Sequence, residues 1–542
     1  MTHHAAQAKK DHWFRGIAWI VGAALTTLYY FFGLHFKWYS ADVDRGLLQG
    51  LDMARGNVLL NHWYSGSDSY WTIDSVFFAF GVLFIGAKVA LLHLESALVW
   101  ASVIMAGIAI ATTDLRRWST SVAAASIVVI LGLPCSLLAG FLVPSTLHVA
   151  TALYALLAFL GLRRGRFGWG WFLAVAMFAA GILGDPLIVA YGLIPAFIVG
   201  ILDSVRARRW KQGISTWSAP FAGLAIAWVL RVVADQLGTY RITGTTSVVP
   251  HQLILPNLRL LFENTISLFG LGNSLTTSHI PWELELFRSF GLLAVVAGVV
   301  VGMACLVLGL ISGKPRLEVQ GMRARSEASF RLSDLLVLGF CGDAVTYVFL
   351  SVDKAGLRYL SAGAIFASIL GAMLLGHVAN AITTRRARRV VVGLGLVVAG
   401  VCASSVGVVL SQPTLVAPYA QLGDFLSSHH LYRGVGDYWS SAPTTVLSDE
   451  MVKVRQVVVS SSGGIEPYQW ISKSSWYSGQ FQFLVYDATL STGQNIRQAS
   501  KFPFAPVAHT YVDHQFHIVV WKKPETMLRL NDLARATKYP HN

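Results

Sequence analysis

Two aspartates separated by a single valine, Asp42 and Asp44, lie in a polar stretch that interrupts a very apolar chain. Alternate side chains of an extended segment point to the same side, which allows both carboxyls to reach one site, whereas on a helix they diverge. Such a pair accepts a proton from an attacking hydroxyl or holds a divalent metal ion, whereas the plainer interpretation is that both carboxylates are hydrated. The stretch from residue 37 to 74 contains five aspartates: Asp42, Asp44, Asp52, Asp68 and Asp74.

The same stretch combines aromatic and polar residues in the segment HWYSGSDSYW, which begins at His62. Tryptophan and tyrosine commonly form a belt at the membrane interface, and this is the plainer interpretation. They also stack on sugars or pack against a lipid chain. The sequence therefore makes Asp52, His62 and Trp63 candidates for lining a cavity.

Two shorter segments add polar groups. In GILGDPLIVAYGL, Asp185 either caps the helix that Pro186 opens or faces the same cavity. In SVDKAGLRYL, Arg358 with help from Lys354 is suited to grip a lipid-linked phosphate, because a guanidinium forms paired hydrogen bonds with phosphate oxygens. An interfacial anchor or an ion pair with an acidic neighbour are the alternatives, and Tyr359 is a further cavity candidate.

The composition identifies the elements that must position these residues. The chain has 542 residues, of which 54% are hydrophobic and 13% charged, and its mean hydropathy is +0.55. Soluble domains carry about 25% charged residues, so apolar runs of this length indicate a membrane protein with many helices. The net charge of +14 falls largely in short loops, where it orients the chain, and nucleic acid is not expected as a partner. All four cysteines lie in apolar runs, so we expect them to pack inside helices. Their spacing matches neither a disulfide framework nor a zinc site.

Basic clusters at the ends of the apolar runs predict the topology. If every cluster is cytoplasmic, the N-terminus is cytoplasmic, the C-terminus is outside, and a helix over SVFFAFGVLFIG lies on the outer surface. About eleven transmembrane helices follow, at residues 16–36, 90–112, 121–141, 146–162, 168–184, 187–204, 216–235, 289–311, 334–350, 359–382 and 391–411.

The composition changes after residue 411. The segment APYAQLGDFLSSHH has a helical period, and STGQNIRQASKF predicts a second helix. The segments TTVLS, VKVRQVVVS, FQFLVYD and FHIVVWKK read as strands. We therefore expect an all-α polytopic membrane domain over 1–411, with outer loops 37–89 and 238–288, followed by a small extracytoplasmic α/β domain over 412–542.

The order of these features resembles the GT-C fold glycosyltransferases, integral membrane enzymes that take sugars from polyprenyl-phosphate donors. The first outer loop begins with the acidic pair and contains the surface helix SVFFAFGVLFIG. The second span ends in the basic turn DLRRW, and Arg358-Tyr359-Leu360 precedes a late span. A soluble outer domain after the last span is also common in that family. Family members often carry a neighbouring Asp-Glu pair, whereas Val43 separates the two acids here.

The resemblance covers about residues 1–411 and implies sugar transfer at the outer membrane face. The donor would be a polyprenyl-phosphate-linked sugar, and the acceptor a glycan, lipid or protein hydroxyl. Asp42 or Asp44 would be the base of one inverting displacement, and Arg358 with Lys354 would hold the departing phosphate. Some members bind a divalent metal, which the acidic pair permits, and no other cofactor is implied. The segment WYSGSDSYWTID is similar to one in uncharacterised bacterial members, so the resemblance does not imply which sugar is transferred. A multi-pass protein of the bacterial plasma membrane is the expected location.

Two other classes of function stay open at this point. A transporter or lipid flippase would use charged groups deep in the membrane, for which Arg231 and Asp343 are candidates. A scaffold without catalytic activity would use the outer domain to bind a partner.

Overall fold

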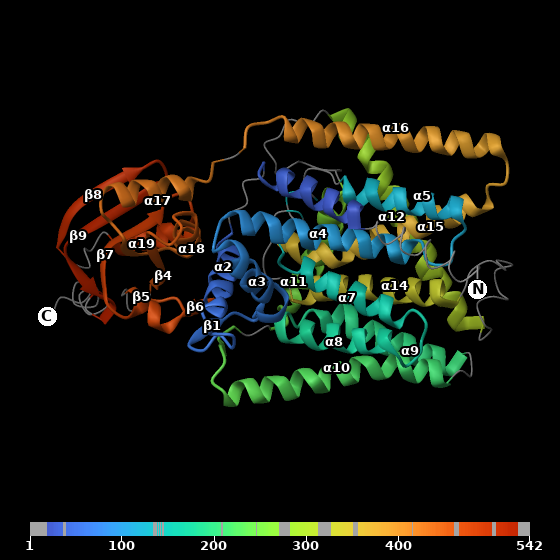
Figure 1. Ribbon diagram of the computed structural model, residues 1–542, viewed down its shortest axis with the longest axis horizontal. Coiled ribbons are helices and arrows are strands. Elements are labelled where there is room, and N and C mark those ends of the chain that lie inside the picture. The colour runs from blue at the N-terminus through green and yellow to red at the C-terminus, as the bar shows by residue number, and fades with distance from the viewer. Residues whose placement is uncertain are drawn as a thin grey trace. The chain divides into compact units, whose positions relative to one another are not determined.

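Figure 1 shows the fold of the protein as a computed structural model. The structure describes residues 19–35, 40–133, 138, 140, 143, 146–206, 210–244, 247–269, 282–312, 327–350, 356–414, 416–459, 465–500, 506–528 and 530. The chain divides into two compact units, which are described separately. The first consists of Met1–Phe36, His93–Arg231 and Thr246–Pro413, and the second of Lys37–Leu92, Val232–Thr245 and Thr414–Asn542.

Helices build the first unit. They are Trp19–Gly33, α4 (Ala90–Ala111), α5 (Arg117–Ile127), α7 (Val149–Leu162), α8 (Trp169–Gly184), α9 (Ile194–Arg206), α10 (Trp210–Gln236), α11 (His251–Leu268), α12 (Trp282–Ser312), α14 (Glu327–Leu350), α15 (Ser361–Ala381) and α16 (Arg385–Leu410). The first residues of α4 and the last of α10 belong to the second unit. Two π-helical turns, Val128–Gly132 and Val189–Leu193, continue α5 and precede α9.

Helix α15 is the most deeply buried of the long apolar helices that the structure describes. It packs against α5, α12 and α14, and many of its residues are glycine, alanine or serine. A Cβ atom at Gly371 would lie only 2.8 Å from the Ala294 carbonyl oxygen of α12. Small residues thus allow these two helices to cross closely, as is common in membrane proteins.

The expected spans are confirmed only in part. Within the described residues, six helices are long and apolar enough to cross a membrane, rather than about eleven. The six are Ala90–Ala111, Trp210–Gln236, Gly291–Ile311, Ala328–Leu350, Gly356–Ala381 and Arg385–Leu410. The other five expected ranges contain apolar helices of at most 17 residues. Two of these helices, Val149–Leu162 and Trp169–Gly184, end at turns within the described residues. At about 1.5 Å per residue they reach less than roughly 25 Å, short of the roughly 30 Å hydrocarbon core. The hydropathy pattern does not show where such turns lie.

The second unit contains a six-stranded sheet in the order β5-β4-β3-β7-β9-β8. Strand β3 pairs in parallel with β4 and β7, and the other pairs are antiparallel. The strands are β3 (Arg433–Gly436), β4 (Lys453–Val459), β5 (Ile465–Pro467), β7 (Gln480–Asp487), β8 (Val507–Asp513) and β9 (Phe516–Thr526). Helix α17 (Pro418–Ser428) covers one face through Leu422 and Leu426, and α19 (Ser491–Ser500) covers the other through Ile496.

The predicted C-terminal elements are confirmed with one exception. Both expected helices form, and three of the four expected strands form as β4, β7 and β9. The segment TTVLS instead lies in helix α18 (Tyr438–Leu447), so the strand prediction there is wrong. Asp437 caps this helix, and the hydroxyls of Thr444 and Thr445 donate to the carbonyls of Ser440 and Ser441 one turn back. Capping and tertiary packing thus outweigh the β preference of these branched residues.

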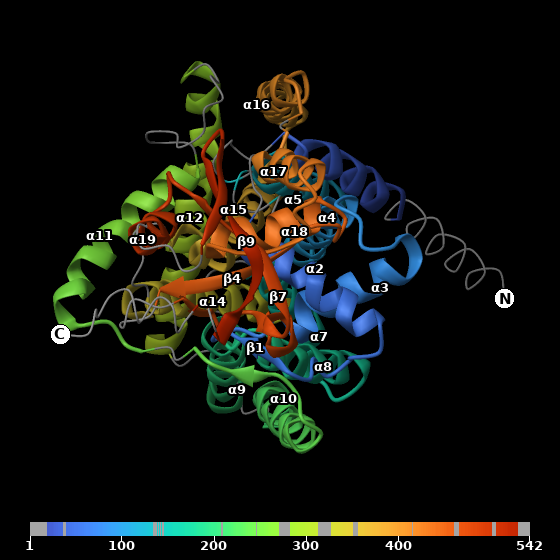
Figure 2. The same ribbon diagram turned by 90° about the vertical axis from the view of Figure 1, so that its left-hand side faces the viewer.

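Two parts of the chain far from the C-terminal segment in sequence complete the second unit. Strand β1 (Trp63–Ser65) pairs in parallel with β2 (Arg241–Ile242) and antiparallel with β6 (Ser472–Lys473), so one small sheet joins all three segments. Helices α2 (Ala41–Ala54) and α3 (Val76–Ile85) pack together, and α2 also packs against α18. Figure 2 shows α18 beside α2. The expected surface helix SVFFAFGVLFIG is thus a helix, α3, whose Phe80 and Phe84 are exposed.

Candidate functional site

Helix α2 carries the acidic pair. Ser40 caps the helix by accepting a hydrogen bond from the Asp42 amide, 3.3 Å away, and two acidic residues in the first turn suit the positive end of the helix dipole. Of the two cases that the sequence leaves open, an extended segment or a helix, the helix is therefore the one found. On a helix, residues two apart are separated by about 160° around the axis, so Asp42 and Asp44 face different surroundings.

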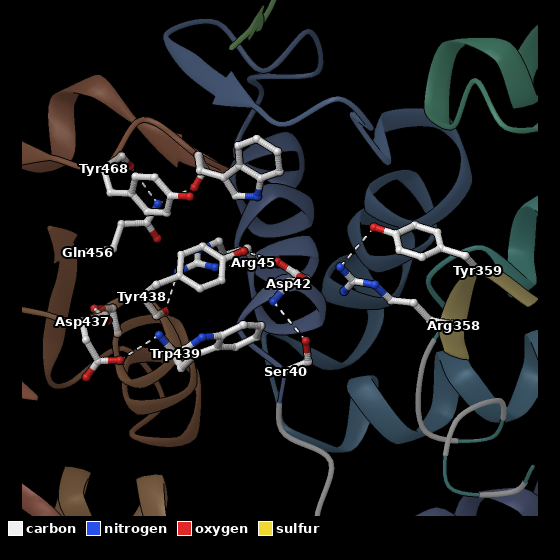
Figure 3. A network of polar contacts seen from close by, with 12 residues as sticks. Ser40, Asp42, Arg45, Arg358, Tyr359, Asp437, Tyr438, Trp439, Gln456 and Tyr468 are labelled. Atoms are coloured by element: carbon white, nitrogen blue, oxygen red, sulfur yellow. Dashed lines mark hydrogen bonds and ion pairs between the residues drawn. The ribbon is translucent and has the colours of Figure 1, made fainter. Parts of the chain in front are cut away.

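Asp42 contacts the C-terminal part of the second unit. The Tyr438 hydroxyl donates a hydrogen bond to Asp42 Oδ1, and Arg45 Nη1 lies 4.0 Å from the same oxygen. Arg45 is fully buried; its Nη2 donates to the Tyr438 carbonyl oxygen at 2.8 Å, and its Cζ lies 3.8 Å from the centre of the Tyr438 ring. Figure 3 shows this stacking of Arg45 on Tyr438 beside Asp42.

Tyr438 is the first residue of α18, directly after strand β3 and the helix cap Asp437. The Asp437 carboxylate accepts from the amides of Trp439 and Ser440, from the Ser440 hydroxyl at 2.6 Å, and from the Asp487 amide of β7. These bonds fix the first turn of α18 to the centre of the sheet. Burial and the nearby Asp42 carboxylate hold the pKa of Tyr438 well above its ordinary value, so the phenol keeps its proton and acts as a donor.

Asp44 has a different environment. Its side chain is 1% exposed, and neither carboxyl oxygen has a hydrogen-bond partner among the residues that the structure describes. Burial raises the pKa of Asp44 to about 8, although the charge of Arg45 opposes the rise and that of Asp42 adds to it. A buried carboxyl without partners costs free energy, which indicates a group kept for a ligand or for chemistry.

Asp52, His62 and Trp63, the predicted cavity candidates, connect structural elements. The Asp52 carboxylate accepts from Trp63 Nε1 at 2.8 Å and forms an ion pair with Lys473 of β6 at 2.8 Å. Trp63 is buried and packs edge-on against Trp476. His62 has an exposed side chain, and its carbonyl accepts from the Ser474 amide. These three residues join α2 and β1 to the C-terminal segment.

The metal expectation receives no geometric support from the acidic pair. The two carboxyls diverge around α2, as described above. Within the described residues, no group of three or more histidine, cysteine, aspartate or glutamate side chains is arranged to hold a metal ion.

The first unit contains a second polar cluster. The Asp185 carboxylate lies 2.8 Å from His148 Nδ1, accepts from the Thr151 hydroxyl at 2.7 Å, and accepts from the Leu187 amide at 3.0 Å. One Asp185 oxygen thus holds the turn that follows α8, and the other binds side chains of α7 and the residue that precedes it. The next helical turn has Ile188 at its N-cap and no side-chain cap, so the expectation that Asp185 caps a helix opened by Pro186 is wrong. His148 directly precedes α7 and has a φ of 64°, a left-handed conformation that is uncommon for a residue other than glycine.

Tyr359 and Arg358 lie next to this cluster. The Tyr359 ring centre is 4.9 Å from that of His148, and Arg358 Nη2 lies 3.3 Å from the Tyr359 hydroxyl. The structure therefore brings Asp185 and Tyr359 to the same place through His148, with Arg358 beside them. Lys354, the predicted helper of Arg358, lies outside the described residues.

The sequence predictions missed Arg45, Tyr438 and His148. Arg45 follows Asp42 by three residues, a spacing that places both on one face of a helix once a helix is assigned. Tyr438 follows the segment GVGD, in which a strand end and a helix-capping aspartate are recognisable. His148 has no sequence signal of this kind.

Comparison with known proteins adds no family to this description: no protein-family model matches the sequence, and no curated protein is significantly similar to it.

Proposed function

We propose that the protein is a membrane glycosyltransferase of the GT-C type, which moves a sugar from a polyprenyl-phosphate donor to an acceptor hydroxyl at the outer membrane face. One observation carries the proposal: Asp44 is a buried carboxyl whose two oxygens have no hydrogen-bond partner among the described residues. It lies in the first turn of the helix that follows the first apolar helix. The long apolar helices support the membrane location.

Asp44 is the favoured base. In the proposed step, an acceptor hydroxyl attacks the anomeric carbon while its proton passes to the Asp44 carboxylate. The bond from that carbon to the donor phosphate breaks, and the anomeric centre inverts. An ordinary aspartate is a weak base at neutral pH. With a pKa of about 8, Asp44 is ionised in only a minority of molecules at pH 7, but its ionised form is a much stronger base. Asp42 is less suited to this role because Tyr438 already donates to its carboxylate.

The departing phosphate needs cationic donors that are in place before the reaction. We assign this role to Arg358, with Lys354 as its predicted helper, because a guanidinium grips a phosphate with two hydrogen bonds. The position of Arg358 on Tyr359, next to the His148 and Asp185 pair, supports a preformed polar site in the first unit.

The test uses purified protein in lipid vesicles. The probes are undecaprenyl-phosphate esters of glucose, mannose and arabinose, with an envelope fraction from a strain that lacks the gene as acceptor. Release of undecaprenyl phosphate is followed by mass spectrometry. We expect release by the wild type and a loss of at least about a hundredfold in Asp44→Asn, while the exposed control Asp424→Asn keeps its rate. Full activity in Asp44→Asn, in Asp42→Asn and in the double variant would contradict the proposal.

The same vesicles test the transport alternative. A transporter would use Arg231 and Asp343, but the Asp343 carboxylate accepts from the Gly363 amide at 2.9 Å and is only 3% exposed. That contact joins α14 to α15 and gives Asp343 a structural role. Movement of a probe across the vesicle membrane without release of its sugar would support transport instead.

A further inference from the structure

The contacts of Tyr438 with α2 have no part in the proposed transfer as described so far. Tyr438 makes three contacts with two residues of α2: its hydroxyl binds Asp42, its carbonyl accepts from Arg45, and its ring lies under the Arg45 guanidinium. All three cross from the C-terminal segment to a helix nearly 400 residues earlier in the chain, within one compact unit.

These contacts specify the orientation of two charged side chains. Arg45 is fully buried, and its only hydrogen bond to a described residue is the one from Nη2 to Tyr438. The Tyr438 ring also packs against Tyr468 at 5.4 Å and Trp439 at 4.9 Å, so it has little freedom to turn (Figure 3). A buried guanidinium held on an aromatic face keeps its position because stacking and hydrogen bonding both restrict it.

The position of Arg45 matters because it directly follows the proposed base. Its positive charge favours the ionised form of Asp44, and the Asp42 charge disfavours it. A residue that fixes both Arg45 and Asp42 therefore controls the surroundings in which Asp44 gains and loses its proton. Such supporting contacts determine activity even without touching the substrate.

We propose that Tyr438 is a positioning residue of the transfer reaction, so that the C-terminal α/β domain forms part of the catalytic machinery and does more than stabilise the fold. This inference rests on the proposed function. It assigns Tyr438 to the catalytic step, in which Asp42 and Arg45 must be correctly oriented, and not to the binding of the donor.

The experiment compares Tyr438→Phe and Tyr438→Leu with wild type in the vesicle assay, with the exposed Tyr432→Phe of the same domain as control. We expect kcat to fall about tenfold in Tyr438→Phe, which keeps the ring, and about a hundredfold in Tyr438→Leu, which loses the stacking. The KM for the donor should change less than twofold, and Tyr432→Phe should match the wild type.

A double-mutant cycle separates positioning from general stabilisation. If Tyr438 acts through Asp42, Tyr438→Phe has no further effect on kcat in an Asp42→Asn background, whereas a merely structural loss multiplies in the double variant. A multiplied loss, or an unchanged kcat in Tyr438→Leu with an active wild type, overturns the inference and leaves the proposed function intact. A wild type that releases no undecaprenyl phosphate from any probe overturns both.

Discussion

At the scale of single residues, Asp42 and Asp44 differ in what surrounds their carboxyl groups. Asp42 has a phenol donor and a guanidinium near it, whereas Asp44 is buried with both oxygens unpartnered among the described residues. Asp42 accepts a hydrogen bond from Tyr438, whereas the desolvation of Asp44 is opposed by the charge of Arg45 without a hydrogen bond from a described residue. We interpret this imbalance as stability given up at a functional position, which is a common property of active sites.

The pKa of Asp44 predicts how stability depends on pH. With a folded-state pKa of about 8, against an ordinary value near 4, the folded chain keeps a proton that the unfolded chain loses between these pH values. The free energy of unfolding therefore falls as pH rises from about 4 to about 8. Asp44→Asn lacks this dependence, so its melting temperature relative to wild type should rise by several degrees between pH 5 and pH 8.

The measurement is thermal unfolding of the solubilised protein at both pH values, with Asp424→Asn as the exposed control. A difference between Asp44→Asn and wild type that stays constant with pH would show that Asp44 has an ordinary pKa in the folded protein.

The sequence supplied the residue types of the site but not its pairings. The position of Asp42 and Asp44 after an apolar run is visible in the sequence, and so is that of Asp185 before a proline. The partner of Asp42 is not, because Tyr438 lies almost 400 residues away and no local pattern links the two. Only the tertiary fold gives the Asp42 carboxylate a hydrogen-bond donor and leaves Asp44 without one among the described residues.

At the scale of elements, two faces of helix α2 contact different parts of the second unit. Asp42, Arg45, Gln49 and Asp52 follow a helical spacing and form a polar stripe. Gln49 accepts from the Ser75 hydroxyl at 2.7 Å, and Asp52 binds Lys473. This stripe connects α2 to the rest of the second unit by polar contacts, while another face packs against α3.

The packing of α2 on α3 depends on glycine. A Cβ atom at Gly50 would lie 2.5 Å from the Phe78 Cβ and 2.8 Å from the Ala79 amide nitrogen. Gly50→Ala should therefore lower the free energy of unfolding by about 1–3 kcal/mol, because the two helices must move apart. Gly400→Ala in α16, where a Cβ meets nothing within 4 Å, should be neutral or slightly stabilising.

Thermal or denaturant unfolding compares these two variants with wild type. If Gly50→Ala had the same free energy of unfolding as Gly400→Ala, α2 and α3 would not pack as closely as the structure shows.

Hydropathy and residue preferences predicted which segments form helices or strands better than they predicted where those helices and strands end. Hydropathy located a helix in each expected span, yet two of these helices, of 14 and 16 residues, end at turns. The β-branched residues of TTVLS indicated a strand, but Asp437 caps a helix there. In both cases a capping or turn contact decides the outcome, and such contacts involve residues that a composition window does not weigh.

At the scale of the whole molecule, the composition of the second unit constrains the topology. A compact unit built from the segments 37–92, 232–245 and 414–542 must have all three on one side of the membrane. In the described chain, six apolar helices lie between the first and second segments, of which two are long enough to span. Four lie between the second and third, and all four are long enough. Every count is even, so each interval returns the chain to the same side.

These even counts place the acidic pair and the C-terminal domain on one side of the membrane but do not choose the side. Cysteine labelling tests the predicted orientation, in which both are outside. The variants Val58→Cys, Arg241→Cys and Ser475→Cys place one exposed thiol in each segment, in a background with the four native cysteines replaced by alanine. A membrane-impermeant maleimide should label all three in intact cells, because no folded unit can have its strands on opposite faces of a bilayer.

Arg164→Cys and Arg386→Cys are the matched controls, since each lies in a basic cluster that the positive-inside rule assigns to the cytoplasm. They should react only after the cells are permeabilised. If only one or two of the three test thiols were labelled, the chain would cross the membrane an odd number of times between two of the segments. The three segments could then not form one compact unit. Labelling of the controls alone in intact cells would place Asp42 and Asp44 in the cytoplasm, away from any donor on the outer face.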